Sequence, residues 1–361
     1  MKTVVVYDID SYIPNLALMK ISAFYKNQGY KVKLSNQVKY IRADKYFGSA
    51  VFHNEHTKLK IKALYSEFGS DIQIGGSGYC LKQKLPDEID SCFPDYKLYN
   101  HNKYALGFLT RGCNKRCVFC LVSRKEGRLN HSYADFEDFV PKHQKNVMLL
   151  DNNLLASENS TEILEKIIRR KYYVNFSQSL DIYRLTNRNV ELLRKVNSVN
   201  SRFTYPMIYF SCNSVRQAKQ FYTRENLLRS FGREAVTVII MFGYNTRLSE
   251  DYAMLMMAKK LGLVPFVQQY KPVPGIPSKL PEDYFDMDLD EIAAIKFRRN
   301  GQNNEKFLKY VNRLYFQKYG KYYLPLLRSI YRYNHKSGIN KFLDKVELIS
   351  EKQHIRPSHS P

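Results

Sequence analysis

The chain has 361 residues, of which 44% are hydrophobic, so it can bury a sizeable core and global disorder is excluded. No segment approaches ~18 uninterrupted apolar residues, and the N-terminus lacks a signal-peptide pattern, so we expect a cytoplasmic protein without a membrane-spanning helix. The 57 Lys and Arg residues outnumber 34 Asp and Glu residues, and the net charge of +23 favours a polyanionic partner, although a Lys-rich proteome would also raise it.

Residues 1–100 alternate between strand and helix patterns, which predicts a small flavodoxin-like or Rossmann-like α/β domain with a parallel sheet. The last strand ends in a glycine-rich turn at 75–78, which would let the backbone approach a phosphate or a corrin, although such turns are common without a ligand. Residues 81–102 contain two prolines and scattered charge and are typical of a connection between domains. The predicted strands are 3–7, 31–34, 49–53 and 71–74, and the predicted helices are 15–28 and 56–68.

A second alternation of strands and helices begins near Tyr104 and continues to about residue 270. Six repeats in ~165 residues fall short of a full (β/α)₈ barrel, which typically needs ~250, so we predict a partial (β/α)₆ barrel for residues 101–275. The predicted strands are 105–110, 146–151, 173–177, 203–210, 235–242 and 265–269, and the predicted helices are 133–139, 159–171, 188–197, 213–230 and 248–261.

Residues 276–361 form the third predicted region, which is basic and mainly helical in pattern. Residues 291–361 hold 15 Lys and Arg against 5 Asp and Glu. Lys and Arg bind phosphates and Tyr rings stack on bases, so this region is a candidate for nucleic-acid binding. Aromatic residues at helical spacing are also typical of a buried core. The interleaved rings are Tyr310, Tyr315, Phe316, Tyr319, Tyr322 and Tyr323.

Three of the six cysteines, Cys113, Cys117 and Cys120, lie within eight residues. They directly follow the first strand of the second alternation, and the carboxyl ends of parallel strands are where active sites gather. Thiolates are the usual ligands of iron–sulfur clusters, and four normally complete a cubane. Three thiolates would leave one iron open to bind and activate a small ligand.

This Cys-x₃-Cys-x₂-Cys spacing, with Phe119 directly before the last cysteine, resembles the signature of the radical S-adenosylmethionine (SAM) superfamily. The resemblance covers residues 104–270. It implies that the three cysteines hold a [4Fe–4S] cluster and that SAM binds the open iron through its amino and carboxylate groups. It further implies that Phe119 packs beside the adenine, that a flavodoxin-type or ferredoxin-type protein supplies electrons, and that a 5′-deoxyadenosyl radical abstracts hydrogen from the substrate.

Two other metal sites compete with this interpretation. A zinc site usually has four ligands, but Cys80, Cys92 and Cys212 are isolated and no His-x₃₋₅-His pair accompanies the trio. A cluster used only for electron transfer would need a fourth cysteine nearby. The alternative function is a non-catalytic nucleic-acid-binding protein with a structural metal.

Polar residues follow the second strand of the repeat at Asp151, Asn152 and Asn153. In the superfamily this strand often ends in Gly-Gly-Glu, which binds the amino group of SAM. The sequence departs from that tripeptide, but carboxylate and amide oxygens also accept hydrogen bonds from an ammonium group. The alternative is a polar turn without a ligand.

Further SAM contacts are predicted after later strands. Gln178, Asp181 and Arg184 suit a ribose hydroxyl, a charge pair and a carboxylate, and this run is similar to one in the radical SAM subset that carries an N-terminal cobalamin-binding-like domain. An Asp181–Arg184 pair that caps the next helix is the alternative. Gly243 resembles the superfamily's glycine-containing segment near the adenine, and Gln268 could line the pocket or be structural.

The N-terminal domain lacks the cobalamin motif of related enzymes, Asp-x-His-x-x-Gly. The matching residues run from Asp8 to Ile13 and contain neither the histidine nor the glycine. Because the axial imidazole is missing, we favour a degenerate domain that keeps only the scaffold, although cobalamin could still bind without a protein ligand. The catalytic residues, the substrate and the reaction type stay open, with nucleic acid or a nucleotide as one candidate substrate and a peptide or a small metabolite as the others.

Overall fold

The structure, a computed structural model, describes residues 1–232, 235–270, 280–295 and 301–331. The chain divides into two compact units, one built on Met1–Tyr209 and the other starting at Phe210. Within the described residues, no helix combines the length and apolar character needed to cross a membrane.

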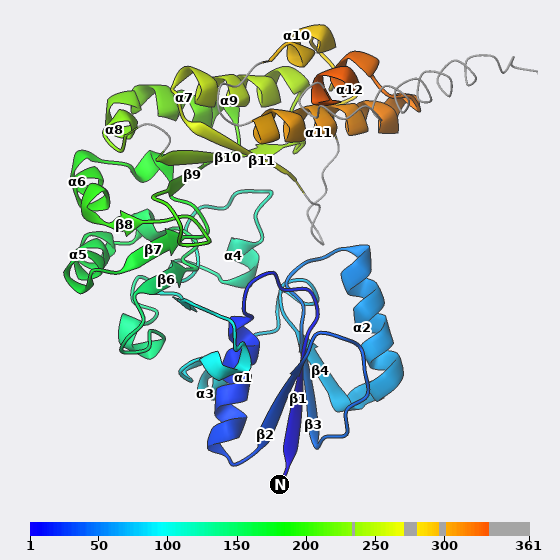
Figure 1. Cartoon of the computed structure of the whole chain (residues 1–361), viewed down its shortest axis with the longest axis vertical. Helices are drawn as coiled ribbons and strands as arrows, with labels where there is room; N and C mark the ends of the chain where they lie inside the picture. The colour runs from blue at the N-terminus through cyan, green and yellow to red at the C-terminus, as the bar shows by residue number, and fades with distance from the viewer. Residues whose placement is uncertain (233–234, 271–279, 296–300, 332–361) are drawn as a thin grey trace, which may run out of the picture. The chain divides into compact units, whose positions relative to one another are not determined.

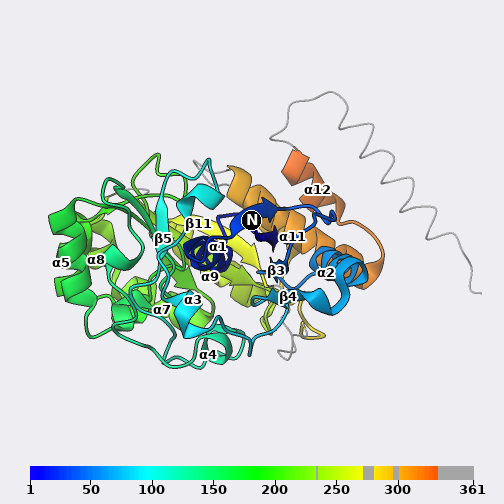
Figure 2. The same ribbon diagram turned by 90° about the horizontal axis from the view of Figure 1, so that it is seen from below.

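The first unit begins with a four-stranded parallel sheet in the order β2-β1-β3-β4 (Figure 1). This confirms the predicted parallel α/β arrangement. Alternating side chains of β1 face opposite sides, so Val4 and Val6 pack with α1, whereas Val5 and Tyr7 pack with α2. The two helices α1 and α2 lie on opposite sides of this sheet (Figure 2). The elements are β1 (Thr3–Asp8), α1 (Leu16–Asn27), β2 (Lys31–Ser35), β3 (Lys45–Ser49), α2 (Glu55–Phe68) and β4 (Ile72–Gly75).

The strand predicted at 49–53 is wrong by four residues, because β3 ends where that prediction begins. The carboxylate of Asp10 accepts the N–H groups of Val51 (2.7 Å) and Phe52 (2.9 Å), and also the hydroxyl of Thr57 (2.7 Å). These N–H groups are therefore committed to a side chain and cannot continue the strand ladder.

The rest of the first unit contains a second parallel sheet, in the order β5-β6-β7-β8. The helix predicted at 133–139 is wrong, because only a three-residue 3₁₀ turn forms at Phe136–Asp138. Phe136 and Phe139 are both buried, and Phe139 leaves the helical region with φ −146°. The elements are α3 (Asp87–Asp90), β5 (Ala105–Gly107), α4 (Val122–Lys125), β6 (Asn146–Leu149), α5 (Ser160–Arg170), β7 (Tyr173–Phe176), α6 (Asn187–Lys195) and β8 (Asn197–Ser198).

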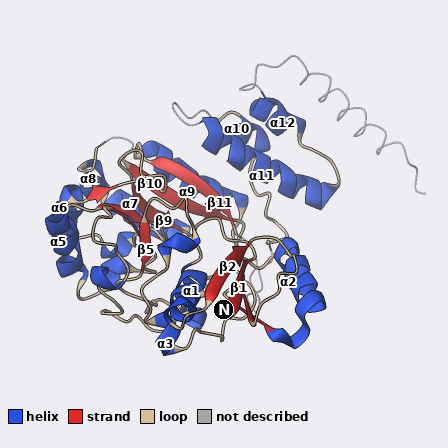
Figure 3. Ribbon diagram, turned by 60° about the horizontal axis from the view of Figure 1, so that its bottom comes forward, coloured by secondary structure: helices blue, strands red, loops and turns tan. Residues whose placement is uncertain are grey.

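The second unit is built on a three-stranded sheet in the order β11-β10-β9, with helices around it (Figure 3). The strand predicted at 203–210 starts later, at Ile208, because Phe203 sits in a turn with φ 58° and Pro206 has no N–H to donate. The helix predicted at 213–230 is interrupted at Arg224. The elements are β9 (Ile208–Cys212), α7 (Val215–Thr223), α8 (Glu225–Arg229), β10 (Val236–Phe242), α9 (Leu248–Lys260), β11 (Val264–Gln269), α10 (Leu289–Ala293), α11 (Gly301–Tyr319) and α12 (Leu324–Tyr331).

The six strands predicted for the partial barrel thus belong to two sheets in the described part of the chain, and the barrel stays a prediction. The helical pattern predicted beyond residue 331 lies outside the described residues.

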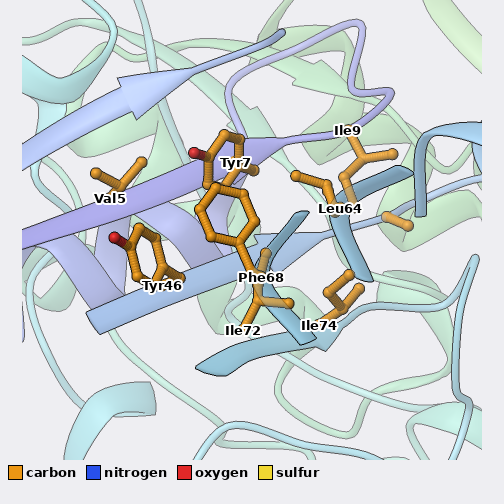
Figure 4. Packing of buried hydrophobic residues seen from close by; sticks show 9 residues of the cluster. Val5, Tyr7, Ile9, Tyr46, Leu64, Phe68, Ile72 and Ile74 are labelled. Atoms are coloured by element: carbon orange, nitrogen blue, oxygen red, sulfur yellow. The ribbon is translucent and has the colours of Figure 1, made fainter. Parts of the chain in front are cut away.

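The aromatic cluster between the N-terminal sheet and α2 offers a test of the packing. Phe68 is buried, with its ring 4.5 Å from that of Tyr46 and 5.5 Å from that of Tyr7 (Figure 4). We expect Phe68→Ala to lower the free energy of unfolding by about 3–5 kcal/mol, because it leaves a cavity. Leu59→Ala, on the same helix but 65% exposed, should change it by less than about 0.5 kcal/mol. Urea titrations would measure both, and equal losses would contradict this packing.

Candidate active site

The three clustered cysteines lie on one closed loop, residues 111–130, which we term the cysteine loop. Its two ends are joined by a backbone pair, in which the N–H of Arg111 donates to the Asn130 carbonyl (3.1 Å) and the N–H of Asn130 donates to the Arg111 carbonyl (2.8 Å). Inside the loop, the N–H of Cys113 donates to the carbonyl of Gly127 (3.2 Å). The base of the loop is therefore fixed by its own backbone.

The end of β6 anchors the start of the cysteine loop. Asp151 is buried, and its Oδ1 accepts the N–H of Thr110 (2.5 Å), the hydroxyl of Thr110 (2.7 Å) and the N–H of Leu109 (3.2 Å). The side-chain oxygen of Asn152 accepts the N–H of Gly112 (2.9 Å). Asp151 and Asn152 thus hold the loop, and their predicted contact with SAM stays a prediction.

A partly buried charge network holds the other side of the loop base. The guanidinium of Arg111 donates to Glu126 (2.6 Å), Asp90 (2.9 Å) and the Tyr133 hydroxyl (2.5 Å), and Asp90 also pairs with Lys20 of α1 (3.0 Å). Burial alone would raise the pKa of Asp90, but the Tyr133 hydrogen bond and the charges of Lys20 and Arg111 outweigh it and lower that pKa. Each charge of the network has a partner of opposite sign.

The three thiols are partly exposed and lie within electrostatic range of one another. Burial is the largest cause that raises the pKa of Cys117 and of Cys120, and the other thiols add to it. The sulfur of Cys113 accepts the backbone N–H of Lys115 (3.3 Å) and the side-chain amide of Asn153 (3.5 Å). N–H donors to sulfur stabilise a thiolate, which is the form that binds iron.

Asn153 leaves a buried acceptor beside these thiols. Its amide nitrogen faces Cys113, and its Oδ1 has no hydrogen-bond partner among the described residues. A buried carbonyl oxygen without a donor costs free energy, so its presence indicates a donor supplied by a ligand. The ammonium group of SAM is such a donor, and the residues around the thiols fit the predicted cofactor.

The cysteine loop is tied to the segment after β7 by an ion pair that the sequence did not predict. The ammonium of Lys115 lies 2.5 Å from Oδ2 of the buried Asp181 and 4.6 Å from the ring centroid of Tyr183. The alternative of an Asp181–Arg184 cap is correct only in part, because Asp181 caps the 3₁₀ turn Ile182–Arg184 by accepting the N–H of Tyr183 (3.2 Å), whereas Thr186 caps α6. Asp181 therefore lies at the cysteine loop, while Gln178 and Arg184 are exposed.

The other predicted SAM contacts are less constrained by the structure. Phe119 is partly buried on the cysteine loop. Gly243 and Gln268 belong to the second unit, where Gln268 is exposed. Gly243 has φ 73°, and a Cβ there would collide with the hydroxyl of Tyr310. The predicted contacts of all three residues with SAM stay predictions.

Sequence reasoning also missed Asp251, a buried carboxylate in α9. It accepts the Thr246 hydroxyl (2.7 Å), the Tyr284 hydroxyl (3.0 Å) and the N–H of Gly243 (3.3 Å), so it fixes the turn that follows β10. Acidic residues are common in the first turn of a helix because they complement the helix dipole. The sequence pattern therefore does not distinguish a buried carboxylate with several hydrogen-bond donors from an ordinary exposed one.

The geometry of the described residues does not favour a zinc site. Nowhere in them do three His, Cys, Asp or Glu side chains gather around the position of a single ion. In a cubane each thiolate binds a different iron, so its cysteine sulfurs need not converge on one point. A tetrahedral zinc site requires that convergence.

The glycine-rich turn of the N-terminal domain packs closely on its own backbone. A Cβ on Gly76 would collide with the Ala50 carbonyl, and one on Gly78 would collide with that of Phe52. The two glycines are therefore needed for backbone packing, and the expected absence of cobalamin stays a prediction. Asp8, where the missing motif would begin, accepts the N–H of Ser11 (3.1 Å) and the hydroxyl of Tyr99 (2.6 Å).

No protein-family model matches the chain. Its curated relatives include three enzymes named tRNA-2-methylthio-N(6)-dimethylallyladenosine synthase. The Fusobacterium nucleatum enzyme is 24% identical over 47% of this chain and 42% of its own length. The Aquifex aeolicus enzyme is 23% identical over 64% and 57%, and the Bacteroides thetaiotaomicron enzyme is 23% identical over 55% and 51%. The chain spans about half the length of these relatives.

Solved structures of Streptococcus suis SuiB also match. The SAM-bound structure has a TM-score of 0.38 at 15% identity, over 62% of this chain and 51% of that chain. The structure with the precursor peptide SuiA has a TM-score of 0.36 at 13% identity, over 72% and 58%. The sequence similarity to the synthases supports the radical SAM superfamily for this chain and does not extend to the cobalamin-binding-like subset.

The buried carboxyl group of Asp251 should make the stability of the fold depend on pH. Burial raises its pKa to about 7 from 3.8, although its three hydrogen bonds partly offset this. Between these values the folded state keeps a proton that the unfolded state has lost, so this carboxyl group destabilises the fold as pH rises from about 4 to 7. We expect the unfolding free energy of wild type minus that of Asp251→Asn to fall by about 1.4 kcal/mol per pH unit in this window. Urea titrations across this range would measure it, and a flat difference would contradict it.

Proposed function

We propose that this protein is a radical SAM enzyme that cleaves SAM reductively and uses the resulting 5′-deoxyadenosyl radical to modify a C–H bond of its substrate. One observation carries the proposal. Three thiols share a loop anchored at the carboxyl end of a parallel strand, beside the buried, unsatisfied amide oxygen of Asn153. This combination provides three ligands for a cubane and an acceptor for the amino group of SAM.

Cys113, Cys117 and Cys120 would hold the [4Fe–4S] cluster. When bound and reduced, the cluster supplies the electron that breaks a carbon–sulfur bond of SAM. Asn153 would orient both partners, because its Nδ2 donates to the Cys113 sulfur while its Oδ1 accepts from the SAM ammonium. Asp151 would act before any cofactor binds, because its hydrogen bonds with Thr110 already fix the start of the cysteine loop.

The remaining SAM contacts are proposals from the superfamily resemblance. Phe119 would pack on the adenine, and Gln178 and Arg184 would contact the ribose and the carboxylate. Asp181 would act indirectly, since its carboxylate pairs with Lys115 of the cysteine loop. Gly243 and Gln268 would complete the nucleoside contacts.

We further propose a flavodoxin-like domain at 1–100, a partial (β/α)₆ barrel at 101–275 and a basic helical region at 276–361. The strand order β2-β1-β3-β4 is consistent with the first domain. A flavodoxin-type or ferredoxin-type protein would deliver the electron. A structural-metal protein without catalysis is disfavoured, since no single-ion ligand group exists among the described residues.

Nucleic acid is the proposed substrate class. Two observations support it, namely the net charge of +23 and the similarity to enzymes whose name specifies a tRNA nucleoside.

The cluster ligands can be tested by cysteine replacement. We expect wild-type protein, reconstituted anaerobically, to hold about four irons per chain and, after reduction, to form 5′-deoxyadenosine from SAM. Ala at position 113, 117 or 120 should abolish this product and lower the iron content, because two thiolates do not retain the cubane. Cys92→Ala, a partly exposed cysteine outside the loop, is the matched control and should keep both. Product from Cys117→Ala would refute the ligand assignment.

The role of Asn153 can be tested by SAM binding. We expect Asn153→Ala to weaken SAM affinity by about 10- to 100-fold with the iron content unchanged, because a hydrogen bond to a charged group is lost. Asn146→Ala, at the start of β6, should bind SAM like wild type. Anaerobic calorimetry would measure both affinities, and an unchanged affinity in Asn153→Ala would exclude this contact.

A further inference from the structure

Helix α11 presents a basic and aromatic face to solvent. Lys306, Lys309, Arg313 and Phe316 are separated by three or four residues, so they lie along one side of the helix, and all four are exposed. We term these four residues the α11 basic face. The face spans ~15 Å at 1.5 Å per residue. The buried positions of the helix are Phe307, Leu308, Tyr310, Val311, Asn312 and Leu314.

Exposed aromatic rings stand at both ends of this face. The Tyr322 ring stacks on that of Phe316, with centroids 4.5 Å apart and planes 21° apart, and the two side chains are 40% and 39% exposed. At the other end, the ammonium of Lys306 lies 5.1 Å from the ring centroid of Phe266 in β11, which is 41% exposed. The face thus has an exposed pair of stacked rings at one end and an exposed ring beside a cation at the other.

The positive charge of the face is largely uncompensated. Residues 301–331 contain six Lys and Arg but a single acidic residue, Glu305. Glu305 pairs with Lys309. Within the described ranges, no carboxylate forms an ion pair with Lys306 or Arg313, and the guanidinium of Arg313 lies over Tyr310 instead (5.7 Å). These two cations are thus available to a polyanion.

We propose that the α11 basic face binds a single-stranded RNA segment, with Lys306, Lys309 and Arg313 on its phosphates and a base stacked on the Phe316–Tyr322 pair. Cations that follow a backbone beside exposed rings are typical of single-strand binding, because unpaired bases offer π-faces. A membrane-surface helix would instead turn its apolar side outward, and that side of α11 is buried in the unit. The choice of RNA as the polyanion rests on the proposed function, whereas the positive charge and the exposed rings are observed independently of it.

The charge contribution can be measured without cluster or SAM. The probe is a fluorescein-labelled 12-nucleotide single-stranded RNA of mixed sequence, titrated with full-length protein in an anisotropy assay at several salt concentrations. We expect K306Q/R313Q to bind more weakly and to reduce the slope of log K against log salt by about 1.4, since each lost phosphate contact removes about 0.7. K58Q/K62Q, which removes two exposed lysines from α2, should keep the wild-type slope. Circular dichroism melts would check that each variant is folded.

The contribution of base stacking can be measured separately with a variant of Tyr322. We expect Tyr322→Ala to weaken RNA binding about fivefold or more, because one stacked base is lost, with little change in the salt slope. Tyr205→Ala, also an exposed tyrosine, should bind like wild type.

Several results would overturn the inference. These are equal salt slopes for K306Q/R313Q and the control, tighter binding of a duplex than of the single strand, or binding only to phosphatidylserine vesicles. Wild-type protein that cleaves SAM but does not bind the RNA probe would refute this surface and leave the proposed function standing. Conversely, RNA binding by a protein that cannot cleave SAM would retain the surface and refute the enzyme.

Discussion

The geometry of the candidate site depends on one buried carboxylate, that of Asp151. It lies at the end of β6 and accepts three hydrogen bonds from Leu109 and Thr110, where the neighbouring strand has just ended. A carboxylate is suited to this task because it can accept several N–H and O–H groups at once. The cysteine loop therefore starts from a fixed point, and its thiols are brought near Asn153 on the same β6 turn.

Two cations of the cysteine loop are paired with carboxylates. Arg111 at its base meets Asp90 and Glu126, and Lys115 within it meets Asp181. Burial raises the pKa of the Cys117 thiol, which must become anionic to bind iron. The charge of Lys115 lowers that pKa and so offsets the burial in part, whereas the carboxylate of Asp181 raises it.

Local patterns predicted most of the strands and helices, because the burial periodicity of α1, α2 and β10 is visible in neighbouring residues. The failures have non-local causes. Strand β3 ends early because Asp10, some forty residues away, captures the N–H groups of Val51 and Phe52. At the site, the spacing of the cysteines was enough to predict the three thiols. Spacing does not show that, among residues 151–153, the side-chain oxygen of Asn153 is the one left without a donor. It also does not show that Lys115 forms an ion pair with Asp181.

Asp90 connects two parts of the first unit, since it takes Lys20 from α1 and Arg111 from the cysteine loop. Without the N-terminal domain, the half-buried guanidinium of Arg111 would lose one of its two carboxylate partners. The first hundred residues thus supply part of the electrostatic support for the cysteine loop. A substitution that removes the charge of Asp90 would deprive both Lys20 and Arg111 of a carboxylate, and its effect would reach the base of the cysteine loop without touching a thiol.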